Sequence, residues 1–303
     1  MLRMSPLTYK DAGVDIDAGD EFVKSIKTDI ASTKQPWVLS DIGLFAGMID
    51  LKMACEEFKE PVLVQVLNGI SCNTVGYDEL SYNSLGCQVV CGCLKKLSSV
   101  KFKPISFLDY IGISRLMPEI HGRIINGMVD RFEDKVYCNT KIPIIGGETA
   151  EMPVIYRNNC VIVVGVLTDV TEAEDIKKID QRYQGTRTLP LSPIFEVYKR
   201  PVLVQSIDGL GTKSKEQKFL GDSMRDLLSH SKNDIAVHGA RPQFALTYID
   251  ANSRSRWNVF KKSTSLLVPY NLVFKKHPGI FQRGQDEEYR CINGKRKIGI
   301  FKR

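Results

Sequence analysis

The stretch Lys59–Gly69, KEPVLVQVLNG, recurs about 140 positions later as Lys199–Gly209, KRPVLVQSIDG. The shared Lys-x-Pro-Val-Leu-Val-Gln, with a glycine at the same distance behind it, is too long to arise by chance. Short β-branched runs of this kind are typical of buried strands. Beyond the glycine the copies differ, because the first continues as Ile70–Asn73 and the second as Leu-Gly-Thr-Lys, ending at Lys213. The sequence therefore predicts two related units, of which only the second keeps an acidic, glycine-rich loop.

Length and composition predict a folded protein with a substantial core. The chain has 303 residues, of which 43% are hydrophobic and 25% charged, enough for one large domain or two ordinary ones. Much of its net charge of +7 comes from the last fifty residues. We expect a solvated basic tail there and no nucleic-acid partner, because no RNA-binding motif with interleaved aromatic residues accompanies the charge.

The location is expected to be cytoplasmic. No apolar run reaches the length of a membrane span, and four aspartates within the first twenty residues are untypical of a signal or transit peptide. The eight cysteines lie mostly in apolar runs and lack the spacing of a zinc site, which predicts reduced, buried thiols.

Strands alternate with helices, so the expected fold class is α/β, layered as α+β, with a mixed sheet and flanking helices. The predicted strands cover 61–67, 86–91, 103–110, 141–145, 160–167, 201–207 and 242–249. The predicted helices cover 18–32, 120–132 and 224–237. The chain then divides into a near-complete first unit (1–170), a linker (171–194), a truncated second unit (195–252) and a basic tail of unknown fold (253–303).

The loop that follows the second copy of the repeat has the composition of a phosphate and metal site. Gly209 and Gly211 let backbone amides approach an anion, and Lys213 can neutralise phosphate. Asp208 ends the strand and could hold Mg²⁺ together with phosphate oxygens. The spacing is not that of a Walker A loop, and a tight turn with a surface lysine is the alternative.

Two further acidic motifs leave alternatives open. Asp234 stands in an apolar run, where an unpaired charge is costly, so it either binds a metal or pairs with an arginine. Glu148 and Glu151 follow two glycines and are three residues apart, which would place both on one side of a turn or first helical turn. They could capture Mg²⁺, hydrogen-bond an amidine, or act as an acidic helix N-terminus.

Together these motifs resemble aminoimidazole ribonucleotide synthetase (phosphoribosylformylglycinamidine cyclo-ligase), which also occurs in the trifunctional purine-biosynthesis protein. The resemblance is carried by Leu7–Gly19, Phe107–Tyr110 (FLDY), Gly146–Met152 (GGETAEM), Ile207–Lys213 (IDGLGTK), and Asn233-Asp234 with Gly239–Pro242. Selenophosphate synthetase and thiamine-phosphate kinase share the broader fold, but the FLDY and GGETAEM motifs argue against them.

The resemblance implies an ATP- and Mg²⁺-dependent ligase of de novo purine synthesis. ATP phosphorylates the amide oxygen of formylglycinamidine ribonucleotide, an internal amine closes the imidazole ring, and phosphate leaves. The implied metal ligands are Asp208 and Asp234; the implied catalytic residues are Lys213, Glu148 and Glu151; and the implied nucleotide-binding residues are Asp15, Asp17, Gly209, Gly211, Thr212 and Lys213.

The motifs also depart from the family pattern. In the first unit Leu67–Asn73 replaces the aspartate loop and Lys95-Lys96 replaces Asn-Asp, while the second unit lacks GGETAEM. The set is complete only when the two units are pooled. One hypothesis is complementation, within the chain or across a homodimer. The alternative is a catalytically impaired paralogue that binds nucleotide or docks onto a full-length synthetase.

Overall fold

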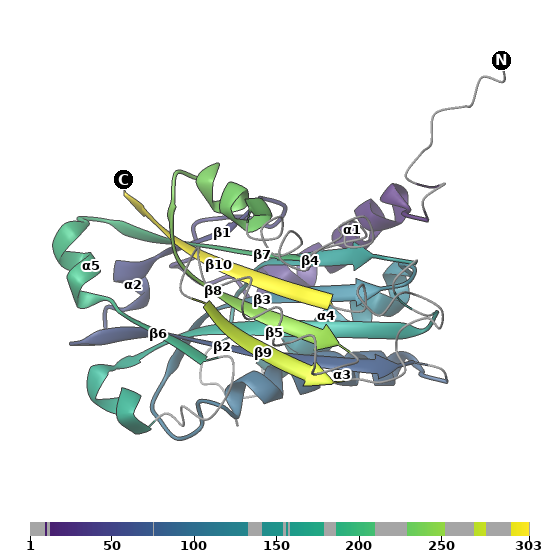
Figure 1. The fold of residues 1–303 in the computed structure, drawn as a ribbon, viewed down its shortest axis with the longest axis horizontal. Coiled ribbons are helices and arrows are strands. Elements are labelled where there is room, and N and C mark those ends of the chain that lie inside the picture. The colour runs from purple at the N-terminus through teal and green to yellow at the C-terminus, as the bar shows by residue number, and fades with distance from the viewer. Residues whose placement is uncertain are drawn as a thin grey trace, which may run out of the picture.

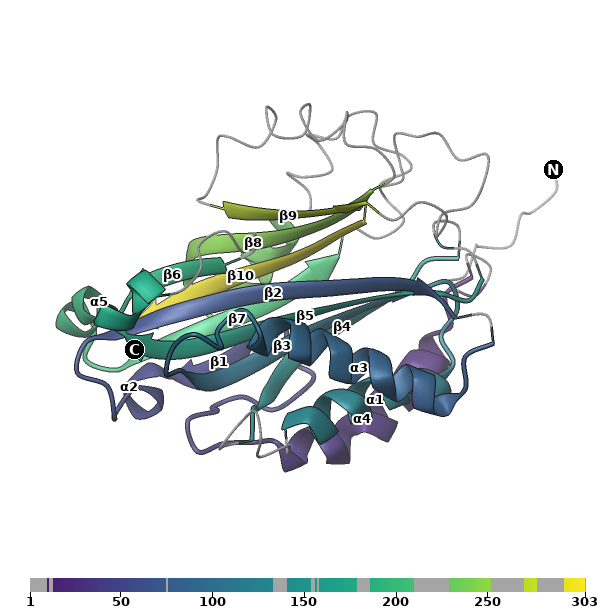
Figure 2. The same cartoon turned by 90° about the horizontal axis from the view of Figure 1, so that it is seen from below.

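The computed structural model of the chain contains two five-stranded sheets packed face to face, with helices covering the outer face of one of them (Figures 1 and 2). We call β4-β3-β5-β2-β6 the first sheet and β1-β7-β10-β8-β9 the second sheet. The residues that the structure describes are 10, 13–74, 76–132, 141–153, 156, 158–178, 186–209, 229–251, 270–276 and 292–302.

The elements have the following bounds. The helices are α1 (Ile16–Ser32), α2 (Leu51–Ala54), α3 (Glu79–Leu94), α4 (Pro118–Phe132), the 3-10 helix η1 (Ala173–Lys178) and α5 (Ser192–Val197), and residues 229–236 are also helical. The strands are β1 (Gly47–Asp50), β2 (Pro61–Asn73), β3 (Lys103–Ile113), β4 (Ile144–Glu151), β5 (Cys160–Glu172), β6 (Thr186–Pro190), β7 (Pro201–Gly209), β8 (Arg241–Ala251), β9 (Tyr270–Lys276) and β10 (Ile292–Lys302).

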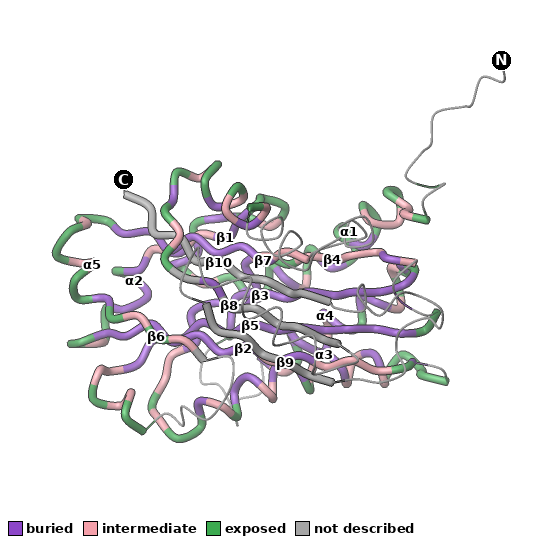
Figure 3. The backbone as a smooth tube through the Cα atoms, in the orientation of Figure 1, coloured by how far each residue is buried: buried purple, intermediate pink, exposed green. Residues whose placement is uncertain are grey.

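The first sheet is buried on both faces because alternate residues of each strand point to opposite sides. On β2, Leu63 and Leu67 pack into the core between the sheets, whereas Val64 and Val66 pack against the helices. Strands buried on both sides read as continuous apolar runs, which explains the character of the repeated stretch. Figure 3 shows these central strands as buried along most of their length.

Helices α1, α3 and α4 form the outer layer (Figure 2). Asp15 caps α1 by accepting a hydrogen bond from the Ala18 amide, and Asp78 caps α3 in the same way at Ser81. Close packing of α3 on α4 requires Gly127, since a Cβ there would collide with the Asn83 backbone. None of the described helices is long and apolar enough to cross a lipid bilayer.

We expect Gly127→Ala to lower the free energy of unfolding by about 1–3 kcal/mol, because the added methyl group forces the two helices apart. Gly19→Ala is the matched control, since nothing lies within 4 Å of its Cβ position on α1. The control should gain up to about 1 kcal/mol from the lower flexibility of its unfolded chain. Urea unfolding measures both changes, and equal effects would contradict this packing.

The two sheets share one strand plan. Read from their corresponding edges they run β4-β3-β5-β2-β6 and β9-β8-β10-β7-β1. In each, the first two strands are parallel and every other neighbouring pair is antiparallel. The register agrees as well. Pro61, the first residue of β2, pairs with Glu172, the last residue of β5, and Pro201, the first residue of β7, pairs with Lys302, the last residue of β10. The repeated stretch therefore occupies the same place in both sheets.

An irregularity in the pairing also recurs. In the first sheet the β3–β5 register shifts between Pro104 and Ser106, and in the second the β8–β10 register shifts past Gln243, next to Pro242. Bulges re-aim the residues that follow them. The residues beyond both prolines thus continue in the same register, so that positions of β3 correspond to positions of β8 that lie 138 residues later.

The sheets exchange edge strands. Strand β1 precedes β2 in the chain but pairs with β7, matching Asp50 to Val202. Strand β6 precedes β7 but pairs with β2, matching Pro190 to Val62. Asp50 and Pro190 are 140 positions apart, and so are Val62 and Val202. The exchange is therefore reciprocal, and each sheet contains an edge strand from the other half of the chain.

A buried polar contact lies between the exchanged halves. Gln65 on β2 and Gln205 on β7 both donate hydrogen bonds from Nε2 to the Thr168 hydroxyl, at 2.8 and 2.7 Å. The Ser106 hydroxyl donates to Gln205 Oε1 at 2.5 Å. Because these side chains are buried, the paired amides fix how the sheets lie on each other.

Several elements differ from the sequence-based expectations. The run at 86–91, expected to be a strand, lies within helix α3. Its apolar residues pack against both β2 and α4, so they do not form the one-sided stripe by which a helix is recognised in a sequence. The expected linker at 171–194 contains η1 and β6. In the expected basic tail, β9 and β10 complete the second sheet, and the alternation around Ile298–Ile300 was hidden by the surrounding charge.

Candidate functional site

Carboxylates from both sheets converge where β7 packs against β3 and β4. Glu148 of β4 is the centre of this group. Burial first, and then the negative charges of Asp208, Asp234 and Asp109, raise the pKa of Glu148 from 4.5 to about 8. Asp109 and Glu148 belong to the first sheet, whereas Asp208 ends β7 and Asp234 lies in the helical residues 229–236. The group therefore draws on both halves of the chain.

Asp109 is the deepest member of the group. Its side chain is buried on β3, and burial raises its pKa to about 7. Gly147 of β4 lies against its carboxylate so closely that a Cβ at this position would collide with both oxygens. The second glycine of the Gly146-Gly147 pair thus admits the carboxylate of the neighbouring strand.

The end of β7 lies on the ring of Tyr110. A Cβ on Gly209 would come within 2.5 Å of that ring, so only glycine allows the approach. Tyr110 is fully buried, and burial followed by the charge of Glu148 raises its phenol pKa above the ordinary range. The FLDY motif of the first half and the Asp-Gly of the second are therefore in direct contact.

Hydrogen bonds orient the two second-half carboxylates. The Ser206 hydroxyl donates to Asp234 Oδ2 at 2.8 Å, which joins β7 to the helical residues 229–236. Asp208 accepts a hydrogen bond from the Gly209 amide at 2.7 Å, and its Oδ2 lies 3.5 Å from Nδ1 of His230. The alternative of a buried Asp234–arginine pair has no support among these contacts.

The group fits a cation that also takes ligands from elsewhere. Within the described residues, no three His, Cys, Asp or Glu side chains are close enough to hold a metal ion by themselves. Mg²⁺ commonly binds one or two carboxylates and completes its shell with water and phosphate oxygens. Like-charged, partly buried carboxylates also favour a positive counter-charge, as the raised pKa of Glu148 indicates.

A cavity of about 480 Å³ adjoins the carboxylates. One wall is the inner face of α1, another is the loop Ile42–Leu44, and β4 closes it with Gly146–Thr149. Asp109 and Glu148 both line this cavity, together with Asp15, Asp20 and Glu151. A mostly apolar cavity with a few convergent polar groups is typical of a small-molecule site.

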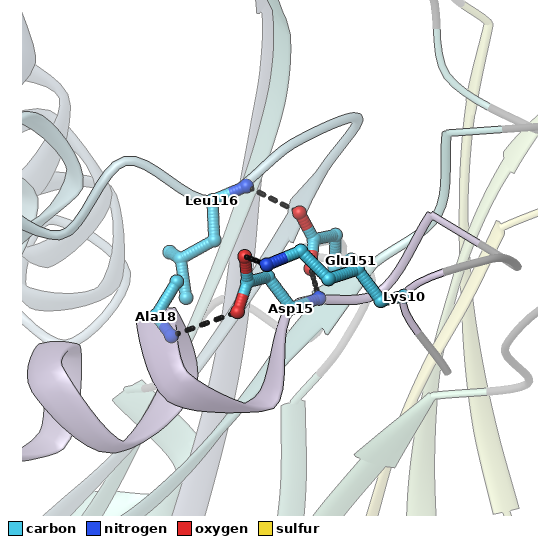
Figure 4. A network of polar contacts seen from close by, with 5 residues as sticks. All are labelled: Lys10, Asp15, Ala18, Leu116 and Glu151. Atoms are coloured by element: carbon cyan, nitrogen blue, oxygen red, sulfur yellow. Dashed lines mark hydrogen bonds and ion pairs between the residues drawn. The ribbon is translucent and has the colours of Figure 1, made fainter. Parts of the chain in front are cut away.

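Glu151 fastens the start of α1 to this cavity (Figure 4). Its carboxylate accepts hydrogen bonds from the amides of Asp15 and Leu116, both at 2.8 Å. Asp15 in turn caps α1 and lies 3.7 Å from the Lys10 ammonium. The hydrogen bond from the Ala18 amide is the main reason that the pKa of Asp15 is lowered. Glu151 thus positions the N-terminal wall.

The structure brings together some of the predicted residues and separates others. Asp208 and Asp234 lie close enough to Glu148 for their charges to raise its pKa, and Asp15 lines the cavity. Glu151 joins a different contact network, because it is on a strand with Glu148 and not on a helical turn. Asp17 is exposed in the first turn of α1. Gly211, Thr212 and Lys213 lie outside the described residues.

Sequence reasoning missed the roles of Asp109 and Tyr110, although it had found their FLDY motif. The signal was an acidic residue inside an apolar strand, which must meet a partner or a ligand.

The raised pKa of Glu148 predicts how stability depends on pH in metal-free buffer. Below pH 4.5 both the folded and unfolded states hold the proton, so its contribution is complete. As pH rises towards 8 only the folded state keeps it, and the free energy of unfolding falls by up to about 1.4 kcal/mol per pH unit, less where solvent reaches the side chain.

Glu148→Gln should therefore become progressively more stable than wild type between pH 5 and 8, measured by urea unfolding with a chelator. Glu119→Gln, at an exposed position of α4, is the matched control and should keep a constant difference. Parallel pH profiles for wild type and Glu148→Gln would contradict the electrostatics described for this group.

Comparisons with known proteins agree with this architecture. The family model described as "AIR synthase related protein, N-terminal domain" matches residues 52–170 and 194–265. The phosphoribosylformylglycinamidine cyclo-ligase of Citrifermentans bemidjiense is 35% identical over 192 residues, covering 63% of this chain and 53% of that protein. The protein of the same name from Lactobacillus helveticus is 34% identical over 178 residues, covering 58% and 49%. The chain spans about half the length of these curated relatives.

Solved structures share the fold at low sequence identity. T. maritima PurL complexed with ATP has a TM-score of 0.54 and 7% identity, covering 80% of this chain and 72% of that one. PurLQS from Thermotoga maritima has a TM-score of 0.51 and 8% identity, covering 80% and 73%. These likenesses support the layered α/β fold expected from the sequence.

Proposed function

The chain belongs to the family of AIR synthase related proteins, N-terminal domain, and on that premise we propose that it is an ATP-dependent cyclo-ligase of purine biosynthesis. Its substrate would be formylglycinamidine ribonucleotide and its product aminoimidazole ribonucleotide. The relatives named phosphoribosylformylglycinamidine cyclo-ligase support the reaction class. The observation that carries the proposal is the convergence of four carboxylates drawn from motifs in both halves of the chain.

The described residues have distinct tasks in this proposal. Asp208 and Asp234 would hold Mg²⁺, and Glu148 and Asp109 would complete the negative surroundings of the ion. When bound, Mg²⁺ would neutralise phosphate charge during phosphoryl transfer. The cavity beneath α1 would hold the substrate next to the carboxylates, with Asp15 and Glu151 keeping its wall in place.

Ligand binding should compete with protons at this site. Burial raises the pKa of both Glu148 and Asp109, and neighbouring carboxylates raise that of Glu148 further, so a cation that binds near neutral pH must displace protons from this group. Lys213, Gly211 and Thr212 would meet the ATP phosphates, as the family resemblance implies. Catalysis would then consist mainly of positioning and charge neutralisation.

Asp208→Asn tests the proposal. It keeps the side-chain shape but removes a metal-binding charge, so substrate-dependent phosphate release from ATP should fall at least about 100-fold. Asp130→Asn, at an exposed position on α4, is the control and should keep full activity. Phosphate release that is unaffected by Asp208→Asn would contradict the assignment. No release from the folded wild type would instead favour the impaired paralogue.

Other expectations about the whole protein remain predictions. These are its cytoplasmic location and its assembly as a homodimer or with a full-length synthetase. Size measurement by light scattering, with and without nucleotide, would test the assembly.

A further inference from the structure

We infer that the chain contains the framework of this site twice, that only one of the two sites can bind MgATP, and that Lys96 closes the other. The inference rests on the proposed function for the identity of the ligand. Its basis is the shared strand plan of the two sheets, which supplies a counterpart in the opposite half for each residue of the acidic group.

The first two counterparts lie in the first half of the chain. Strands β2 and β7 have the same register with their neighbours, which matches Asp208 to Asn68. The equivalent prolines, Pro104 two residues before Ser106 on β3 and Pro242 two residues before Phe244 on β8, extend the match backwards along the chain. The same offset of 138 assigns Lys96 to Asp234. One carboxylate is therefore replaced by an amide and the other by an ammonium group.

The other two counterparts lie in the second half. Tyr110 pairs with Glu148 across β3 and β4, and Tyr248 pairs with Val273 across β8 and β9. Val273 thus stands at the position of Glu148, and Thr247 stands at the position of Asp109. The counterpart site has none of the four carboxylates.

Lys96 makes a contact in the structure that a metal ligand could not make. Its ammonium donates a hydrogen bond to the Leu67 carbonyl in the middle of β2, one residue past the pairing of β2 with β6. Lys96 also follows the last turn of α3, where the orphan carbonyls of a helix favour a positive charge. Asp234 instead reaches the Ser206 hydroxyl near the end of β7. The lysine therefore joins helix to strand where the other site has a carboxylate.

The neighbouring amide is engaged as well. Asn68 Nδ2 donates to the Val89 carbonyl of α3 at 3.5 Å, and Gly92 packs directly against the Asn68 side chain. Asn68 is thereby turned towards α3. A divalent cation at this counterpart site would find no carboxylate at the four positions and would be repelled by the Lys96 ammonium, which disfavours binding.

The halves are therefore asymmetric in a coordinated way. Each site takes two residues from each half, so erasing one site removes the aspartate loop from the first half and the acidic strand residues from the second. This pattern explains why neither half alone has a complete motif set, although one complete site remains.

Calorimetric titration of the full chain with a non-hydrolysable MgATP analogue tests this inference, because it gives the number of analogue molecules bound per chain. We expect one binding event per chain, abolished by Asp208→Asn and retained in Lys96→Met. A second event, or one that survives Asp208→Asn and disappears in Lys96→Met, would overturn the inference. Absence of any binding to wild type would contradict the proposed function, and thermal unfolding would then test the structural role of Lys96 by itself.

For that second measurement, Lys96→Met should lower the melting temperature by at least about 3 °C, because it leaves the Leu67 carbonyl without its charged donor. Lys96→Arg should recover most of the loss. Lys95→Met is the matched control, since Lys95 is exposed at the adjacent position, and should change the melting temperature little. Equal effects of the Lys95 and Lys96 substitutions would overturn the structural role of Lys96.

Discussion

The reciprocal exchange of edge strands is the constraint on which the rest of the structure depends. Because β1 pairs with β7 and β6 with β2, each sheet is completed by a strand that the chain supplies just before the other sheet's repeated stretch. The buried amides of Gln65 and Gln205, sharing the Thr168 hydroxyl, then fix the relative position of the sheets. This arrangement places the end of β7 on the ring of Tyr110.

Site chemistry follows from that placement. Packing β7 against β3 and β4 brings second-half aspartates close to Glu148, whose pKa is raised first by burial and then by these like charges. Burial raises the pKa of Asp109 as well. Burying these carboxylates together lowers the stability of the fold, and a bound cation with its phosphate would offset that loss. The counterpart positions have Lys96 and Asn68, which satisfy local hydrogen bonds instead.

Much of this could be predicted from local sequence, and the rest depended on long-range pairing. Apolar β-branched runs correctly predicted β2, β3, β5, β7 and β8, and helical spacing predicted α1 and α4. The run around Val89 was misassigned because a helix buried on several sides shows no clear stripe. The convergence of Glu148 with Asp208 was proposed by pooling motifs, but the strand exchange that causes it has no local signal. Charge hid β10.

The central claim is that one site is assembled from both halves, and a double-mutant cycle tests it most directly. Mn²⁺ affinity, measured by electron paramagnetic resonance with a non-hydrolysable ATP analogue, would be compared in Glu148→Gln, Asp208→Asn and the double variant. Residues that act on one ion are coupled, so the double variant should lose much less than the sum of the two single losses. Strictly additive losses would show that the two carboxylates act independently and would contradict a shared site.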